Sequence, residues 1–171
     1  MKRSVLVIST VLLGFAPLVA PAGEKAAAEI INVEGRAIGK AALEQGPAGV
    51  LIFIEANGLP PGPHGIHLHS VGACEPDFKA AKGHVNPHKR PHGLLNPDGP
   101  DRGDLPNVFV ALNGNLTAEL FTTFVTLRGG SAPLLDEDGS AFIIHENRDD
   151  QMTQPIGGAG GRIACGVIKA M

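Results

Sequence analysis

The chain has 171 residues, a formal net charge of −3, 23 glycines and 14 prolines, and seven phenylalanines with no tyrosine or tryptophan. That length fits one domain with a substantial core, and the composition favours many turns around a core of Val, Ile, Leu and Ala. No basic run is present, which argues against a nucleic-acid partner.

The N-terminal segment has the features of a secretory signal peptide. Lys2–Arg3 precedes an apolar run, Val5–Ala16, and Ala20–Ala22 matches an Ala-x-Ala cleavage pattern. The run is too short to span a bilayer comfortably, which favours cleavage over a retained membrane anchor. Cleavage would separate a signal peptide, 1–22, from a domain, 23–171, that carries 12 basic and 17 acidic residues, a net charge of −5. We therefore expect a periplasmic or secreted protein with no membrane attachment once the signal is removed.

The two cysteines, Cys74 and Cys165, are predicted to form a disulfide. An even pair in a secreted chain is typical of a disulfide, and this one would close a loop with a sequence separation of 91. In the chain-entropy model such a bridge stabilises the fold by about 4 kcal/mol. The alternative, two free thiols that bind a soft metal, is less favoured because neither cysteine stands beside a histidine.

Short apolar runs separated by turn residues predict an antiparallel sandwich or barrel. Val50–Ile54 is apolar at every position, so we expect a central strand buried on both faces. The alanine-rich piece Glu24–Glu29 is left unassigned. The remaining predicted strands, besides the one that contains His67, are Ile30–Val33, Ala37–Leu43, Val108–Leu112, Leu116–Phe121, Val125–Leu127, Ala141–His145 and Ile163–Ile168.

A His-x-His pattern in Gly65–His69 is the first sign of a metal site. In an extended strand His67 and His69 lie on the same face, and paired imidazoles suit copper or zinc. Taken alone, the pattern is more typical of two surface histidines. The loop that follows, Ser70–Pro106, changes that balance, because a structureless loop of this length is usually functional or disordered. It holds Cys74, His84, His88, His92, Asp98, Asp101 and Asp104.

Six segments rich in His, Asp and Gly follow one another along the chain. They are His64–His69, Gly83–Pro87, Arg90–Gly93, Gly103–Asn107, Ile144–Glu146 and Gly160–Gly166. Together they resemble, in order and spacing, the motifs of the secreted bacterial type of the copper,zinc superoxide dismutase family. The resemblance covers the chain from about Ile30 to its end.

The resemblance implies a Greek-key antiparallel β-sandwich or barrel, of the immunoglobulin-like kind, with two long functional loops. It implies copper and zinc as cofactors and superoxide as the substrate, which two copper redox steps convert to oxygen and hydrogen peroxide. Arg162 would attract and orient the anion, and His84 would bridge the metals and take up a proton. The implied copper ligands are His67, His69, His84 and His145, and the implied zinc ligands include His84, His92 and Asp104.

One position departs from the family. The third zinc histidine is replaced by Asp101, with the spacing to His92 and Asp104 unchanged. Three alternatives are open: Asp101 ligates zinc, His88 replaces the missing histidine, or the zinc site is weak and the protein works with copper alone. We favour the first, because a carboxylate oxygen is an accepted zinc ligand.

Two further residues are expected to support the ligands. By resemblance, Asp149, four residues after His145, accepts hydrogen bonds from His67 and His92. His64 has the opposite strand parity from His67, so we expect it to point away from copper. The resemblance implies that it is a buried hydrogen-bonding residue that supports the copper site.

An enzyme is therefore the leading hypothesis. The alternative is a copper-binding or copper-buffering protein of the same fold with a weakened zinc site and little turnover. A purely structural domain ranks last, because all four copper-histidine positions and Arg162 are present. Family members occur as dimers and as monomers, so a homodimer is one expectation that the sequence does not decide.

Overall fold

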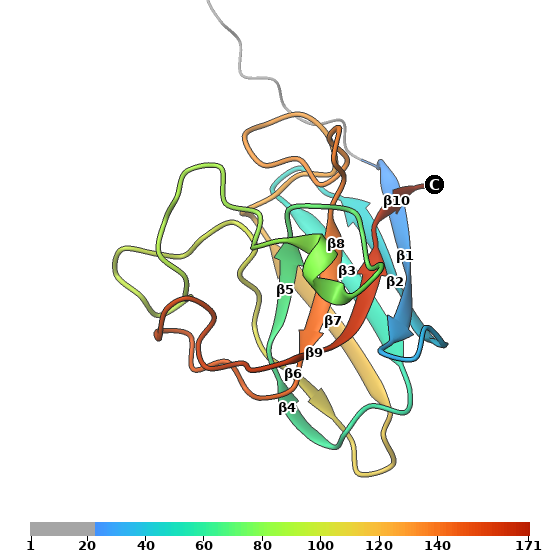
Figure 1. Ribbon diagram of the computed structural model, residues 1–171. Helices are drawn as coiled ribbons and strands as arrows, with labels where there is room; N and C mark the ends of the chain where they lie inside the picture. Colours follow the sequence, from blue (N-terminus) through green and yellow to red (C-terminus); the bar gives the residue numbers. More distant parts are fainter. Residues whose placement is uncertain (1–22) are drawn as a thin grey trace, which may run out of the picture.

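The computed structural model describes residues 23–171, and the predicted signal peptide lies outside the described residues. One antiparallel sheet dominates the fold and curls round on itself, with almost no helix (Figure 1). Its strand order is β5-β8-β9-β1-β2-β3-β7, with β10 paired to β1, while β4 and β6 form a separate pair. The bounds are β1 Lys25–Asn32, β2 Ala37–Gln45, β3 Val50–Ala56, β4 Gly62–His64, β5 Ile66–His69, β6 Val108–Val110, β7 Leu116–Thr122, β8 Ala141–His145, β9 Arg162–Val167 and β10 Lys169–Ala170.

The expected all-β fold is confirmed, and two details of the prediction are wrong. In β3, Val50, Ile52 and Ile54 are buried, but Leu51 and Phe53 are exposed. Because alternate side chains of a strand point to opposite faces, only one face of β3 meets the core. The run Val125–Leu127 is not a strand, since its backbone forms only one isolated bridge.

Other boundaries differ by a few residues. The unassigned alanine-rich piece is part of β1, because alanines at positions 26 and 28 are small enough to pack in the core on its inner face. No strand was predicted just before Gly65, yet Gly62–His64 forms β4 against β6. Among the described residues, no helix is long and apolar enough to cross a membrane.

The two long loops lie side by side at one edge of the sheet (Figure 1). The first, between β5 and β6, contains one short 3₁₀ helix, η1, Phe78–Ala81. The second joins β8 to β9. The predicted disulfide is confirmed and joins Cys74 in the first loop to Cys165 in β9. Phe78 and the disulfide pack with Ile143 of β8 in a small apolar cluster. This cluster fixes the loop against the strands that carry the candidate site.

Candidate metal centre

The long first loop folds back along the free edge of β5. His67 and Asp104 form an isolated antiparallel bridge, and so do His69 and His84. Leu68 bonds the loop through both of its backbone groups. Its amide donates to the carbonyl oxygen of Gly103, and its carbonyl oxygen accepts from the amide of Val85, each at 2.9 Å. These backbone bonds bring loop residues far apart in sequence beside the His-x-His pair.

Gly103 is required where the loop meets β5. A Cβ atom at this position would lie 2.3 Å from the carbonyl oxygen of Leu68 and 2.9 Å from the Cβ of His84. Any larger residue would therefore push the loop away from the strand, and His84 and Asp104 would move with it.

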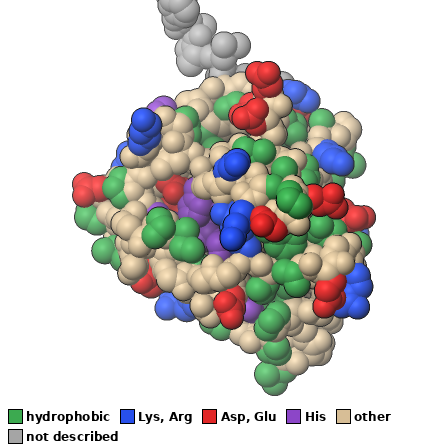
Figure 2. Space-filling view, in the orientation of Figure 1, with side chains coloured by type: hydrophobic (Ala, Val, Ile, Leu, Met, Phe, Trp, Pro, Cys, Tyr) green, Lys and Arg blue, Asp and Glu red, His purple; other side chains and the backbone are tan. Residues whose placement is uncertain are grey.

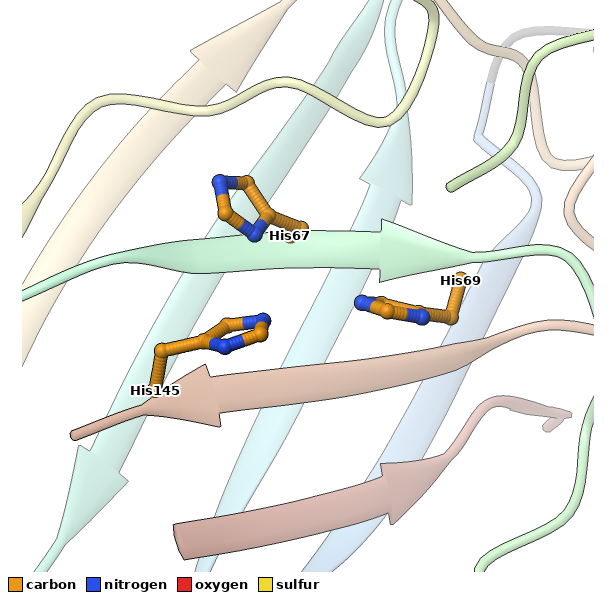
Figure 3. Close-up of side chains that lie close together, drawn as sticks. All are labelled: His67, His69 and His145. Atoms are coloured by element: carbon orange, nitrogen blue, oxygen red, sulfur yellow. The ribbon is translucent and has the colours of Figure 1, made fainter. Parts of the chain in front are cut away.

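The first group of histidines comes from two neighbouring strands. His67 and His69 lie on β5 and His145 ends β8 (Figure 3), and one ring nitrogen from each lies within 4.8 Å of the others. His84 joins them from the loop, with its ring centroid 4.2 Å from that of His67 and 5.1 Å from that of His69. On the surface, histidine side chains appear in a hollow beside basic side chains (Figure 2).

Four buried nitrogen atoms in this group have no hydrogen-bond partner. They are His67 Nδ1, His69 Nε2, His84 Nε2 and His145 Nε2. A buried polar atom without a partner is costly, and a ligand that accepts nitrogen lone pairs removes that cost. Four imidazoles that converge in this way fit copper, which imidazole ligands suit.

The second group combines two histidines with two carboxylates. His84, His92, Asp101 and Asp104 each place one ligand atom within 4.8 Å of the others. His84 Nδ1 lies 2.8 Å from Asp101 Oδ2, and His92 Nδ1 lies 2.5 Å from Asp104 Oδ1. This set of two nitrogens and two oxygens fits zinc. His88, the other histidine of the loop, is exposed and lies outside every such group among the described residues.

The two groups have opposite electrostatic character. Burial lowers the pKa of His69 to about 2 and that of His145 to about 3, and burial also lowers the pKa of His67. These three imidazoles are therefore neutral at pH 7, as a metal ligand must be.

In the second group, nearby carboxylates affect the pKa values of the histidines more than burial does. Burial alone would lower the pKa of His92, but hydrogen bonds to Asp104 and Asp149 raise it to about 10. Burial likewise opposes protonation of His84, and Asp101 and Asp104 raise its pKa. Burial opposes ionisation of Asp104, but hydrogen bonds from His84 and His92 hold its pKa below the ordinary value, and this buried carboxylate favours a bound cation.

Asp149 connects the two groups. Its Oδ2 accepts from His67 Nε2 at 2.8 Å, and its Oδ1 accepts from His92 Nε2 at 3.1 Å. The side chain of Asn107 accepts a hydrogen bond from the backbone amide of Asp149 at 2.8 Å and donates one to its carbonyl oxygen at 2.9 Å. The Asp149 carboxylate therefore fixes which ring nitrogen of each histidine is free for a metal.

His64 does not belong to either group. Its ring is buried, with Nδ1 2.8 Å from the carbonyl oxygen of His145 and Nε2 2.8 Å from that of Pro60. It connects β4 to the end of β8 and contacts the backbone of a candidate ligand.

Arg162 lies beside the first group. It opposes His145 across β8 and β9, and its guanidinium donates to the carbonyl oxygens of Phe78 and of Lys82. A guanidinium has five N–H groups, so others remain for an anion.

The family model for copper/zinc superoxide dismutase (SODC) matches residues 37–168. The chain belongs to the copper/zinc superoxide dismutase family. It is 49% identical over 148 residues to a Cu-Zn superoxide dismutase 1 of Aquifex aeolicus, covering 85% of this chain and 88% of that protein. It is 51% identical over 140 residues to the Cu-Zn superoxide dismutase of Caulobacter vibrioides, covering 80% of each.

Solved structures support the same assignment. The crystal structure of a superoxide dismutase-like protein from Bacillus subtilis has a TM-score of 0.79 at 41% identity, covering 82% of this chain and 96% of that chain. The Cu/Zn superoxide dismutase from Brucella abortus has a TM-score of 0.72 at 25% identity. The resemblance inferred from the six sequence segments is confirmed.

Sequence reasoning missed several contacts of this superoxide dismutase fold. Asn107 was part of a quoted segment, but no role was assigned to it. Gln154, from the second loop, bonds both the amide and the carbonyl of His92, at 2.9 and 2.8 Å. The carbonyl oxygen of Lys82 accepts from His69 Nδ1 at 2.8 Å. Main-chain acceptors leave no residue-type signal, and Gln154 stands in a loop without periodicity.

Proposed function

We propose that this superoxide dismutase binds one copper ion through His67 Nδ1, His69 Nε2, His84 Nε2 and His145 Nε2. The observation that carries the proposal is that these four nitrogens are buried and have no hydrogen-bond partners, in four imidazole rings that lie close together. The opposite ring nitrogen of each histidine is hydrogen-bonded to oxygen, so each free nitrogen is the one that can ligate.

The proposed zinc ligands are His84, His92, Asp101 and Asp104. Asp101 replaces the histidine that the family has at this position, and the carboxylate lies where a ligand is needed. His88 is exposed and lies outside this group, so we propose Asp101 itself as the ligand in place of the histidine. His84 has one nitrogen directed to each group and is proposed as the shared residue.

The reaction converts two superoxide anions and two protons to one oxygen and one hydrogen peroxide. Copper held by these four histidines would supply the electron transfer between the two anions. The guanidinium of Arg162 attracts the anion and orients it by charge-assisted hydrogen bonds. His84 Nε2 is proposed to hold the proton that the developing peroxide requires.

Ligand variants test this assignment. Metal content and superoxide turnover should be measured for the purified mature protein, for His145→Ala and His92→Ala, and for His88→Ala as the matched control. We expect His145→Ala to lose copper and turnover, His92→Ala to lose zinc, and His88→Ala to keep both. Loss of both metals from His88→Ala, or full copper content in His145→Ala, would contradict the assignment.

A copper-buffering protein of the same fold is the second candidate. The observation that favours it is Asp101, because two carboxylates leave the zinc site less positive than the family's three histidines and one aspartate. A buffer would bind copper but consume little superoxide, so turnover by the native protein with both metals separates the two functions.

Location and assembly are further proposals. The disulfide is consistent with a location outside the cytoplasm, and we place the mature protein in the periplasm or outside the cell after cleavage at Ala22. A homodimer, as some family members form, is a prediction that sedimentation velocity tests.

A further inference from the structure

Each of the four histidines in the first group has its second ring nitrogen held by an oxygen of the protein. A main-chain carbonyl serves for two of them: His69 bonds Lys82 and His145 bonds Gly160, at 2.8 and 3.2 Å. His67 uses the carboxylate of Asp149 at 2.8 Å. Such contacts orient a metal-binding imidazole and select its tautomer.

His84 uses the same arrangement as His67. Its Nδ1 lies 2.8 Å from Asp101 Oδ2, and the side chains of both residues are 5% exposed. Asp101 is itself held, because its Oδ1 accepts from the amide of Gly103 at 2.9 Å. A neutral imidazole with its hydrogen on Nδ1 carries its lone pair on Nε2, which is the buried atom of His84 that has no hydrogen-bond partner.

Asp104 is the only other acidic side chain that the structure places within 4 Å of His84 among the described residues. Its Oδ1 is 3.5 Å from His84 Nδ1 and is closer to His92, at 2.5 Å. It therefore contributes less than Asp101 to holding His84.

The identity of residue 101 changes what holds His84 when the second metal is not bound. A neutral histidine offers one acceptor lone pair, and only one of its two tautomers places that lone pair on the nitrogen nearer a given donor. An ionised carboxylate accepts at both oxygens, and its hydrogen bonds are charge-assisted. Asp101 can thus orient His84 through a hydrogen bond with no ion between them.

We propose that Asp101 is a positioning residue that holds His84 toward copper by itself, so that the copper site keeps its geometry and its turnover without zinc. This inference rests on the proposed copper ligation by His84. Through the replacement of the family's histidine by Asp101, the copper site becomes independent of the zinc site.

Substitutions at residue 101 separate its two roles. Asp101→Asn keeps an oxygen acceptor toward His84 but is a poor zinc ligand. Asp101→His restores the family's zinc ligand and removes the charged acceptor. Asp101→Ala removes both roles, and Asp98→Asn changes an exposed aspartate of the same loop as the matched control.

Each protein is purified after secretion as the whole mature chain. It is then stripped of metal and reloaded with copper alone or with copper and zinc. Copper affinity by chelator competition, the electron paramagnetic resonance spectrum of Cu(II), superoxide turnover and thermal unfolding are then measured. In the copper-only form we expect Asp101→Ala and Asp101→His to lose about tenfold in copper affinity, with an altered spectrum. Zinc should restore Asp101→His but not Asp101→Ala. In the copper-only form Asp101→Asn should lose less copper affinity than Asp101→Ala, because it keeps one oxygen acceptor for His84.

The native protein gives the decisive comparison. We expect its copper-only and two-metal forms to share one copper spectrum and similar turnover. The proposal is overturned if the native copper-only form loses copper affinity as much as copper-only Asp101→His does. Absence of turnover in the native two-metal form would instead contradict the proposed function, while the copper affinities would still decide the role of Asp101.

Discussion

His145 and Arg162 face each other across β8 and β9, at a point where the register of the two strands shifts. The pairing places the guanidinium beside a proposed copper ligand. The guanidinium also donates to the carbonyl oxygen of Lys82 at 2.6 Å, and the same oxygen accepts from His69. The residue proposed to guide the substrate is therefore held by the same backbone carbonyl that orients one of the proposed copper ligands, His69.

Replacement of Arg162 by alanine should slow superoxide turnover by about tenfold, because the local positive charge concentrates the anion. The dependence of the rate on ionic strength should weaken as well. Bound copper should be unchanged, and Arg128→Ala, which changes an exposed arginine, should behave as native. Loss of copper from Arg162→Ala would show that this residue supports the metal site instead.

Removal of the Asp149 carboxylate should weaken both metal sites. Asp149→Ala leaves His67 Nε2 and His92 Nε2 without their acceptor, so each ring can rotate or change tautomer. We expect about a 10- to 100-fold loss of affinity for both copper and zinc, measured by chelator competition. Asp136→Ala, at an exposed position, is the control. If only zinc were lost, the contact with His67 would have no role in copper binding.

The stability of the metal-free protein should fall as the pH is lowered from about 6.5 toward 3. The unfolded chain binds protons at His69 and His145 near the ordinary pKa of 6.5, whereas burial keeps these side chains neutral in the folded protein to about pH 2 and 3. Each histidine contributes a slope of at most about 1.4 kcal/mol per pH unit. Urea unfolding at several pH values measures the slope, and a flat profile would contradict neutral buried histidines.

His92 predicts the opposite trend at alkaline pH. Its pKa is raised to about 10 in the folded protein, so its contribution is complete below pH 6.5 and is lost as the pH rises toward 10. In the metal-free protein, His92→Ala should reduce this alkaline loss and leave the acid loss in place, while His84, whose pKa is also raised, keeps its own share. An alkaline loss of unchanged size in the variant would show that His92 does not contribute to it.

The disulfide should contribute about 4 kcal/mol to the free energy of unfolding, because it closes a loop with a sequence separation of 91. The double variant Cys74→Ser and Cys165→Ser should show this loss in urea unfolding. It should also reduce turnover, since Phe78 of the same apolar cluster accepts from Arg162. Unchanged turnover in a folded variant would mean that η1 keeps its place without the bridge.

Much of the fold and of the candidate site was readable from the sequence, because ligand types such as His67 and Asp104 stand in segments with a characteristic order. The sequence did not show which face of β3 is buried, because Leu51 and Phe53 are apolar although they are exposed. Nor could the sequence decide between His88 and Asp101, because that choice depends on how the loop folds back on β5. Contacts through the main chain, as at Lys82, carry no residue-type signal.

The most direct test of a catalytic copper site is the amount of superoxide that the copper-loaded protein consumes, followed by stopped-flow absorbance with superoxide in large excess. We predict continued first-order decay through many equivalents per copper, and no such decay for His145→Ala. Consumption that stops after a single equivalent per copper in the native protein would contradict the account and identify a copper-binding protein without turnover.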